Sequence, residues 1–167
     1  KYSLEAEFEK EIVNHAQAIF GSQTIYVDTK KKIGDSIVSI PDGYLIDLSF
    51  PTDPKLYIIE NELSSHDPYK HIGAQILRFA ISYKESGRKI KKLLLDHILN
   101  RKDDLQKLEK VAAAASYRNI DDLIEAIIFD KKIKAVVIID EASEQLDNVL
   151  SQLTIDTDII EFQTFSN

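Results

Sequence analysis

Two strand-like segments joined by a turn constrain the fold of this chain more than any other feature. Residues 44–50 and 56–62 are rich in aromatic and β-branched side chains, and the Pro-Thr-Asp-Pro stretch at 51–54 between them has turn chemistry. These segments predict two strands that pair with each other. The second strand ends on Glu60 and Glu62, so carboxylates stand where an apolar strand would otherwise continue.

The elements before this pair are a helix and a strand. Apolar residues recur at helical spacing over residues 4–20, with Ser3 as the predicted N-cap and Gly21 just past the end. Residues 25–28 then have the pattern of a short strand. A lysine run at 30–32 lies between this strand and the paired segments.

The elements after the pair alternate between helix and strand. Asp67-Pro68 is typical of a helix start, and this helix is predicted to end near Tyr83, because Ser86-Gly87 breaks its pattern. The remaining elements are a mostly helical region over 89–129 with a helix cap at Asn119, a buried strand over 135–139, a helix over 143–153 and a strand over 158–165. This order predicts a mixed α/β sheet flanked by helices.

Length and composition favour a single globular domain over residues 1–167. A chain of 167 residues can bury a substantial core, and its 44% hydrophobic content is ordinary for a soluble protein. No apolar run approaches the roughly 18 residues of a membrane helix, so no membrane partner is expected. The absence of cysteine excludes disulfides and is compatible with a reducing cytoplasm, the expected location. Because the chain starts at Lys1 and lacks methionine, we expect a trimmed product or a fragment of a longer protein.

The net charge of −7 argues against a protein that coats nucleic acid through bulk electrostatics. It leaves room for an enzyme that gathers carboxylates at a metal site and keeps its basic residues elsewhere. One basic cluster is either a solvated face or a nucleic-acid-binding surface, and it comprises Lys84, Arg88, Lys89, Lys91 and Lys92.

Glu60 and Glu62 lie two residues apart on a strand, so both side chains project from the same face. Apolar residues of that strand lie on this face too. Burying two like charges there is costly unless a cation joins them. A divalent ion that prefers oxygen ligands would resolve the conflict, and Asp42 and Asp47 on the paired strand are candidate third ligands. The alternative is a solvent-facing strand end, with Asp42 in a Pro-Asp-Gly turn. The combination of both halves of the hairpin favours the metal site.

Two further polar residues accompany apolar helix stripes. Gln75 lies within the stripe of Ile72, Ile76 and Phe79, where it either bonds within the core or orients a water or ligand carboxylate at the acidic strand. Glu5 flanks the apolar stripe of the first helix, where it either compensates the helix dipole or supports the acidic site.

Three short motifs occur together in the middle of the chain: Pro41-Asp42, Glu60-Asn61-Glu62, and the Gln-Ile-Leu-Arg-Phe run at 75–79. Their combination resembles the PD-(D/E)XK nuclease superfamily, which has the restriction-endonuclease-like fold. The resemblance implies an αβββαβ core of helix, three antiparallel strands, helix and returning strand. This chain would add a helical insert and a C-terminal helix and strand.

The same resemblance implies roles for individual residues. Asp42 and Glu60 would hold Mg²⁺ or Mn²⁺. Glu5 resembles the acidic residue that many members carry on the first helix, and Gln75 with Phe79 resembles the helix motif of the exonuclease-like branches.

One position departs from the superfamily pattern, because Glu62 stands where a lysine is expected. Glu62 could accept a proton from the attacking water or help to hold a second metal ion, or a lysine from elsewhere, such as Lys70 or Lys84, could reach the site. The choice between Asp42 and Asp47 as the principal ligand stays open, with Asp42 preferred.

These features predict a Mg²⁺- or Mn²⁺-dependent nuclease that hydrolyses phosphodiester bonds, with DNA as the expected substrate and the basic residues at 84–92 on its backbone. The alternative is a catalytically inactive nuclease-like module for nucleic-acid binding or assembly, and a homodimer is compatible with both. A third reading is a structural domain with solvated carboxylates. His66 and His71 flank the start of a helix and receive no assigned role. No Walker loop, dinucleotide-binding glycine pattern or metalloprotease histidine pair is present.

Overall fold

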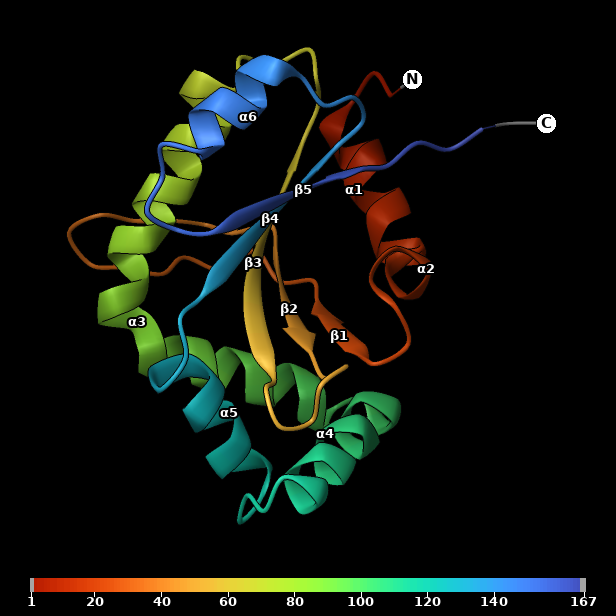
Figure 1. Cartoon of the computed structure of the whole chain (residues 1–167), viewed down its shortest axis with the longest axis vertical. Coiled ribbons are helices and arrows are strands. Elements are labelled where there is room, and N and C mark those ends of the chain that lie inside the picture. Colours follow the sequence, from red (N-terminus) through yellow and green to blue (C-terminus); the bar gives the residue numbers. More distant parts are fainter. Residues whose placement is uncertain (1, 166–167) are drawn as a thin grey trace.

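A computed structural model describes residues 2–165, and in it a mixed sheet of five strands lies between two layers of helix (Figure 1). The spatial order of the strands follows the chain, from β1 to β5. The first three strands pair antiparallel, whereas β3, β4 and β5 pair parallel. This arrangement confirms the predicted mixed α/β sheet. The strands are β1 (Thr24–Val27), β2 (Gly43–Asp47), β3 (Lys55–Glu62), β4 (Lys134–Ile139) and β5 (Thr157–Glu161).

The helices occupy the positions that the sequence pattern predicts, with shifted ends. They are α1 (Glu5–Asn14), α2 (Ala16–Phe20), a π-helical turn η1 (Tyr69–Gly73), α3 (Ala74–Leu99), α4 (Lys102–Ala114), α5 (Ile120–Phe129) and α6 (Glu144–Leu150). Asn119 caps α5 as predicted, because its side-chain oxygen accepts the Asp122 N–H at 2.9 Å. Ser143 caps α6 in the same way, accepting the Leu146 N–H at 3.2 Å.

Several predicted boundaries are wrong. The helix expected over 4–20 divides at His15, and the residue at its N-cap is Leu4 rather than Ser3. Strands β2 and β5 and helix α6 each end about three or four residues earlier than predicted, at Asp47, Glu161 and Leu150. Boundaries are set by tertiary hydrogen bonding as well as by local sequence, so errors of this size are usual.

The largest correction concerns Ser86 and Gly87, which do not interrupt the helix; α3 continues through them to Leu99. Both residues are buried on the inner side of α3. A Cβ atom at Gly87 would lie 2.5 Å from the ring of Phe129 on α5. Gly87 is therefore a close-packing residue, which local sequence cannot distinguish from a helix breaker.

Two apolar cores cover the two faces of the sheet. Helices α3, α4, α5 and α6 pack on one face, and α1 packs on the other, as Figure 1 shows. Helix α1 has 10 residues, which is too short for stability in isolation, so its packing decides its position. Phe8 and Ile12 are each fully buried against the sheet, and burial of such side chains stabilises by about 1.5–3 kcal/mol each. This packing places Glu5 and Glu9 of the same helix near Asp42, which directly precedes β2.

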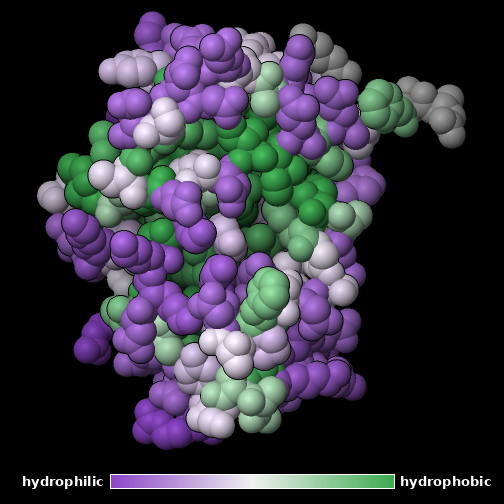
Figure 2. Space-filling view, viewed as in Figure 1, coloured by the Kyte–Doolittle hydropathy of each residue, from purple (hydrophilic) through white to green (hydrophobic). Residues whose placement is uncertain are grey.

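The outer surface is mixed in character. Figure 2 shows one face that is hydrophilic at its top and bottom, with a hydrophobic band across the middle in the region of β4 and β5. Strand β5 forms one edge of the sheet and is only partly buried. Within residues 2–165, no helix has the length and apolarity needed to cross a membrane.

The loop between β1 and β2 is anchored to α3. Ile33 and Ser39 exchange backbone hydrogen bonds at 2.9 and 3.0 Å, and the Gly34 N–H donates to the Ser86 hydroxyl at 2.7 Å. Gly34 has a φ of +87°, and a Cβ atom there would lie 2.0 Å from the carbonyl oxygen of Ile37. Only glycine fits this turn.

We expect Gly34→Ala to destabilise the protein more than Gly21→Ala does. Gly21 also has a positive φ, +98°, but a Cβ atom there meets nothing within 4 Å. Backbone strain alone should cost about 1–2 kcal/mol at Gly21, and strain with a clash about 2–4 kcal/mol at Gly34. Denaturant unfolding measures both free energies. Equal losses would show that the contact with Ile37 is absent in solution.

Candidate metal centre

The candidate site lies where strands β2 and β3 separate. Strand β2 begins at Gly43, which pairs with Ile59, so β3 has no partner from β2 beyond that residue. Asp42 fills the gap: its carboxylate accepts the Asn61 N–H at 2.8 Å, a buried bond that replaces the missing rung of the ladder. Asp42 is thereby held beside Glu60, as the sequence predicts for these two residues.

The carboxylates at this corner are buried. Asp42 is 8% exposed, Glu60 2% and Glu62 3%. Burial raises the pKa of Glu60 well above its ordinary value, and the negative charges of Asp42 and Glu62 raise it further. The solvent-facing strand end considered from the sequence is therefore wrong, because these side chains are enclosed.

Helix α1 adds two carboxylates to the corner. Oxygen atoms of Glu5, Glu9 and Asp42 all lie within 4.8 Å of one another. Burial raises the pKa of both Glu5 and Glu9, and the charge of Asp42 raises each further. The charge of Glu62 at the end of β3 also raises the pKa of Glu5. We call these residues the acidic cluster: Glu5, Glu9, Asp42, Glu60 and Glu62. Glu9 was not a candidate in the sequence analysis.

A lysine that the sequence analysis did not single out meets the acidic cluster. Lys30, in the loop between β1 and β2, places its Nζ 3.0 Å from Asp42 Oδ1 and 2.5 Å from Glu9 Oε1. Burial would lower the pKa of Lys30, but its contacts with Glu9 and Asp42 outweigh burial and raise that pKa. Lys70 and Lys84, the lysines considered for this role, are exposed on η1 and α3. The only sequence signal for Lys30 was the lysine run that precedes the hairpin.

Asp47 does not join the acidic cluster. It pairs with Lys55 at the opposite end of β2, about 17 Å from Asp42 along an extended strand. Its carboxylate accepts the Ser49 N–H at 2.9 Å, as part of a turn. The structure therefore contradicts Asp47 as a ligand shared with Glu60. Strand pairing separates the two aspartates, because they lie at opposite ends of β2.

Gln75 lies in the first turn of α3, half-buried and one turn before the fully buried Phe79. Helical spacing therefore keeps it on the inner stripe of α3, as predicted. No side-chain hydrogen bond that the structure records within residues 2–165 fixes its orientation.

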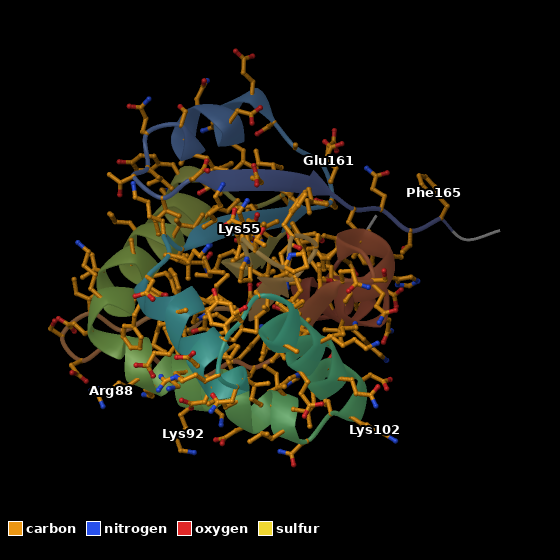
Figure 3. All side chains as sticks on the ribbon, turned by 60° about the horizontal axis from the view of Figure 1, so that its bottom comes forward. Lys55, Arg88, Lys92, Lys102, Glu161 and Phe165 are labelled. Atoms are coloured by element: carbon orange, nitrogen blue, oxygen red, sulfur yellow. The ribbon has the colours of Figure 1, made fainter. Side chains whose placement is uncertain are left out.

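The basic cluster lies away from the acidic cluster. Glu161 pairs with Ile139, which pairs with Glu62. Glu161 therefore marks the end of the parallel strands at which the acidic cluster lies. Figure 3 shows Arg88 and Lys92 pointing outward on the side of the molecule opposite Glu161. Along α3 they are about 20–26 Å beyond Gln75.

Lys91 is committed to ion pairs with Asp121 and Glu125 of α5. Lys84, Arg88, Lys89 and Lys92 are exposed.

Comparisons with protein-family models, with curated proteins and with solved structures return no match. The resemblance to the PD-(D/E)XK superfamily therefore stays a prediction from the sequence motifs.

The donor set fits a hard divalent cation. All five groups of the acidic cluster offer carboxylate oxygens, which Mg²⁺ and Mn²⁺ prefer. Asp42, Glu60 and Glu62 are buried, Glu5 and Glu9 are half-buried, and within the described residues one lysine, Lys30, contacts Glu9 and Asp42. Two or more like charges that share a buried site cost free energy unless a cation or a proton neutralises them. Burial, together with the charges of Asp42 and Glu62, raises the pKa of Glu60 for the same reason.

We expect Glu60→Gln to stabilise the metal-free protein at pH 8 and to have little effect at pH 4. The raised pKa means that the folded state binds this proton more tightly than the unfolded chain. Stability is therefore lost as the pH rises above the ordinary value of 4.5 towards the raised pKa. Removing the charge should raise the free energy of unfolding at pH 8 by about 1–3 kcal/mol.

Denaturant unfolding in a chelating buffer measures this effect, and Glu7→Gln, at an exposed position of α1, is the control. A Glu60→Gln effect of the same size at both pH values would contradict a buried, charged Glu60.

Proposed function

We propose that this protein is a divalent-metal-dependent nuclease with a restriction-endonuclease-like fold, and that its substrate is DNA. The observation that carries the proposal is the acidic cluster at the open end of the β2–β3 hairpin, in which Asp42, Glu60 and Glu62 are buried. Asp42 and Glu60 hold Mg²⁺ or Mn²⁺ in this reading, and Glu5 supports them from α1. When bound, the metal ion supplies a Lewis acid for the phosphate and lowers the pKa of a water.

The element order supports the fold assignment. Helix α1, strands β1 to β3, helix α3 and strand β4 follow the helix, antiparallel strands, helix and returning strand of the αβββαβ core. Helices α4 and α5 are the insert, and α6 with β5 is the C-terminal addition.

The chain's own residues divide the remaining work. Glu62 accepts the proton of the attacking water, since its carboxylate lies beside Glu60 and Glu5. Lys30 supplies the positive charge that the sequence motif lacks, and its position beside Asp42 suits neutralisation of a phosphate oxygen. Gln75 orients a water or a ligand carboxylate from α3.

A catalytically inactive nuclease-like module is the second candidate. It is favoured by Glu62 at the position of the motif lysine and by the net charge of −7. In that case Lys30 neutralises the acidic cluster permanently, and the fold serves nucleic-acid binding or assembly. The homodimer stays a prediction for both candidates.

A cleavage assay decides between these candidates. Plasmid and single-stranded DNA are incubated with Mg²⁺ or Mn²⁺ and followed by gel electrophoresis. We expect Asp42→Ala and Glu60→Ala each to lower kcat/KM at least about 100-fold, because each removes an oxygen ligand and unbalances the cluster. Asp47→Ala is the matched control, an aspartate of the same strand outside the cluster, and should retain activity.

Cleavage that survives both Asp42→Ala and Glu60→Ala would end the nuclease assignment at this site. Absence of cleavage together with absence of any Mg²⁺ or Mn²⁺ binding that depends on Glu60 would favour the inactive module.

We also expect Lys30→Ala to lower kcat by about 100-fold while leaving the fold intact, because the side chain is partly exposed but supplies charge at the site. Lys31→Ala, at the exposed neighbouring position, should have wild-type activity. Equal kcat values for the two variants would show that Lys30 has only a structural role, in its ion pairs with Glu9 and Asp42.

A further inference from the structure

A second group of metal-ligating side chains shares Glu62 with the acidic cluster. Glu62 at the end of β3, His66 in the following loop and His71 in η1 place ligand atoms within 4.8 Å of one another. The His66 Nδ1 atom contacts the Glu62 carboxylate, and the two imidazole rings lie 5.1 Å apart at 30°. Three different segments therefore converge on one point.

The backbone that carries these side chains is held in place. The His66 N–H donates to the Leu63 carbonyl at 2.9 Å, and the His71 N–H donates to the Asp67 carbonyl at 3.0 Å. The Ser64 N–H donates to the carboxylate of the buried Asp140 at 2.7 Å, which fixes the loop to the end of β4.

His71 belongs to the π-helical turn η1 rather than to the regular part of α3. Such turns are rare, and they occur frequently at functional sites.

We propose that Glu62, His66 and His71 form a binding site for a transition metal ion of the zinc class. Two imidazoles and one carboxylate are a ligand set that zinc uses at sites with an open fourth position. This set differs from the all-carboxylate donors around Asp42, because imidazole favours zinc, copper and nickel over magnesium. The proposal requires neither nuclease activity nor an ion at Asp42.

The exposure of the three groups suits an accessible metal site. Glu62 is only 3% exposed, whereas the His66 side chain is 36% exposed and His71 is exposed. The exposed imidazoles leave an entry path for an ion, and solvent could provide the fourth ligand.

Isothermal titration calorimetry with Zn²⁺ at neutral pH tests this site, and Co²⁺, whose visible absorption reports its ligand geometry, is the second probe. We expect the wild type to bind Zn²⁺, and the double variant His66→Ala/His71→Ala to lose about 100-fold or more in affinity. Glu62→Gln should weaken binding as well. His15→Ala is the matched control, an exposed histidine beside a glutamate on α1, and should bind as the wild type does.

The outcomes separate this proposal from the nuclease. Asp42→Ala should abolish cleavage but retain Zn²⁺ binding, whereas the double histidine variant should lose Zn²⁺ binding and keep Mg²⁺ binding. Zn²⁺ affinity that is unchanged in the double histidine variant would overturn the proposal, as would a wild type that binds no Zn²⁺. If the double variant fails to fold, ring-proton NMR of the wild type tests whether Zn²⁺ binds at His66 and His71. Zn²⁺ must shift the resonances of His66 and His71 and leave those of His15 in place.

Discussion

The hydrogen bond from the Asn61 N–H to the Asp42 carboxylate is the interaction on which the site depends. It occurs where the antiparallel ladder of β2 and β3 ends, and it satisfies a buried backbone donor that would otherwise lack a partner. The same bond fixes Asp42 beside Glu60. Backbone pairing and the position of the first two carboxylates are therefore one structural feature, and disturbing either would disturb the other.

The carboxylates gathered around this bond repel one another and lower the stability of the folded protein. Glu60 and Glu62 occupy core positions, and α1 adds Glu5 and Glu9. Within the described residues, Lys30 is the lysine that contacts the acidic cluster, through Glu9 and Asp42. The two apolar cores on either side of the sheet offset this cost. Stability that is given up at one concentrated place is typical of functional sites, where groups are arranged for a ligand rather than for the empty fold.

Local sequence patterns predicted most of the elements. They gave wrong predictions for residues whose role depends on contacts distant in sequence. Gly87 resembles a helix breaker, yet it provides room for the Phe129 ring within α3. Asp47 is a candidate ligand from sequence, yet strand register places it at the far end of β2. The basic residues of α3 follow Gln75 in sequence, but a helix carries them about 20–26 Å from it.

The sequence by itself determined the mixed α/β class, the order of the elements and the Asp42, Glu60 and Glu62 set, because alternation and helical spacing are local properties of the chain. Only the tertiary structure decided which charged groups meet those carboxylates. Lys30 and Glu9 reach Asp42 from a loop and a helix that are 12 and 33 residues away in the chain, and His71 joins Glu62 through a π-helical turn. Such contacts follow from packing against the two faces of the sheet, and no local spacing encodes them.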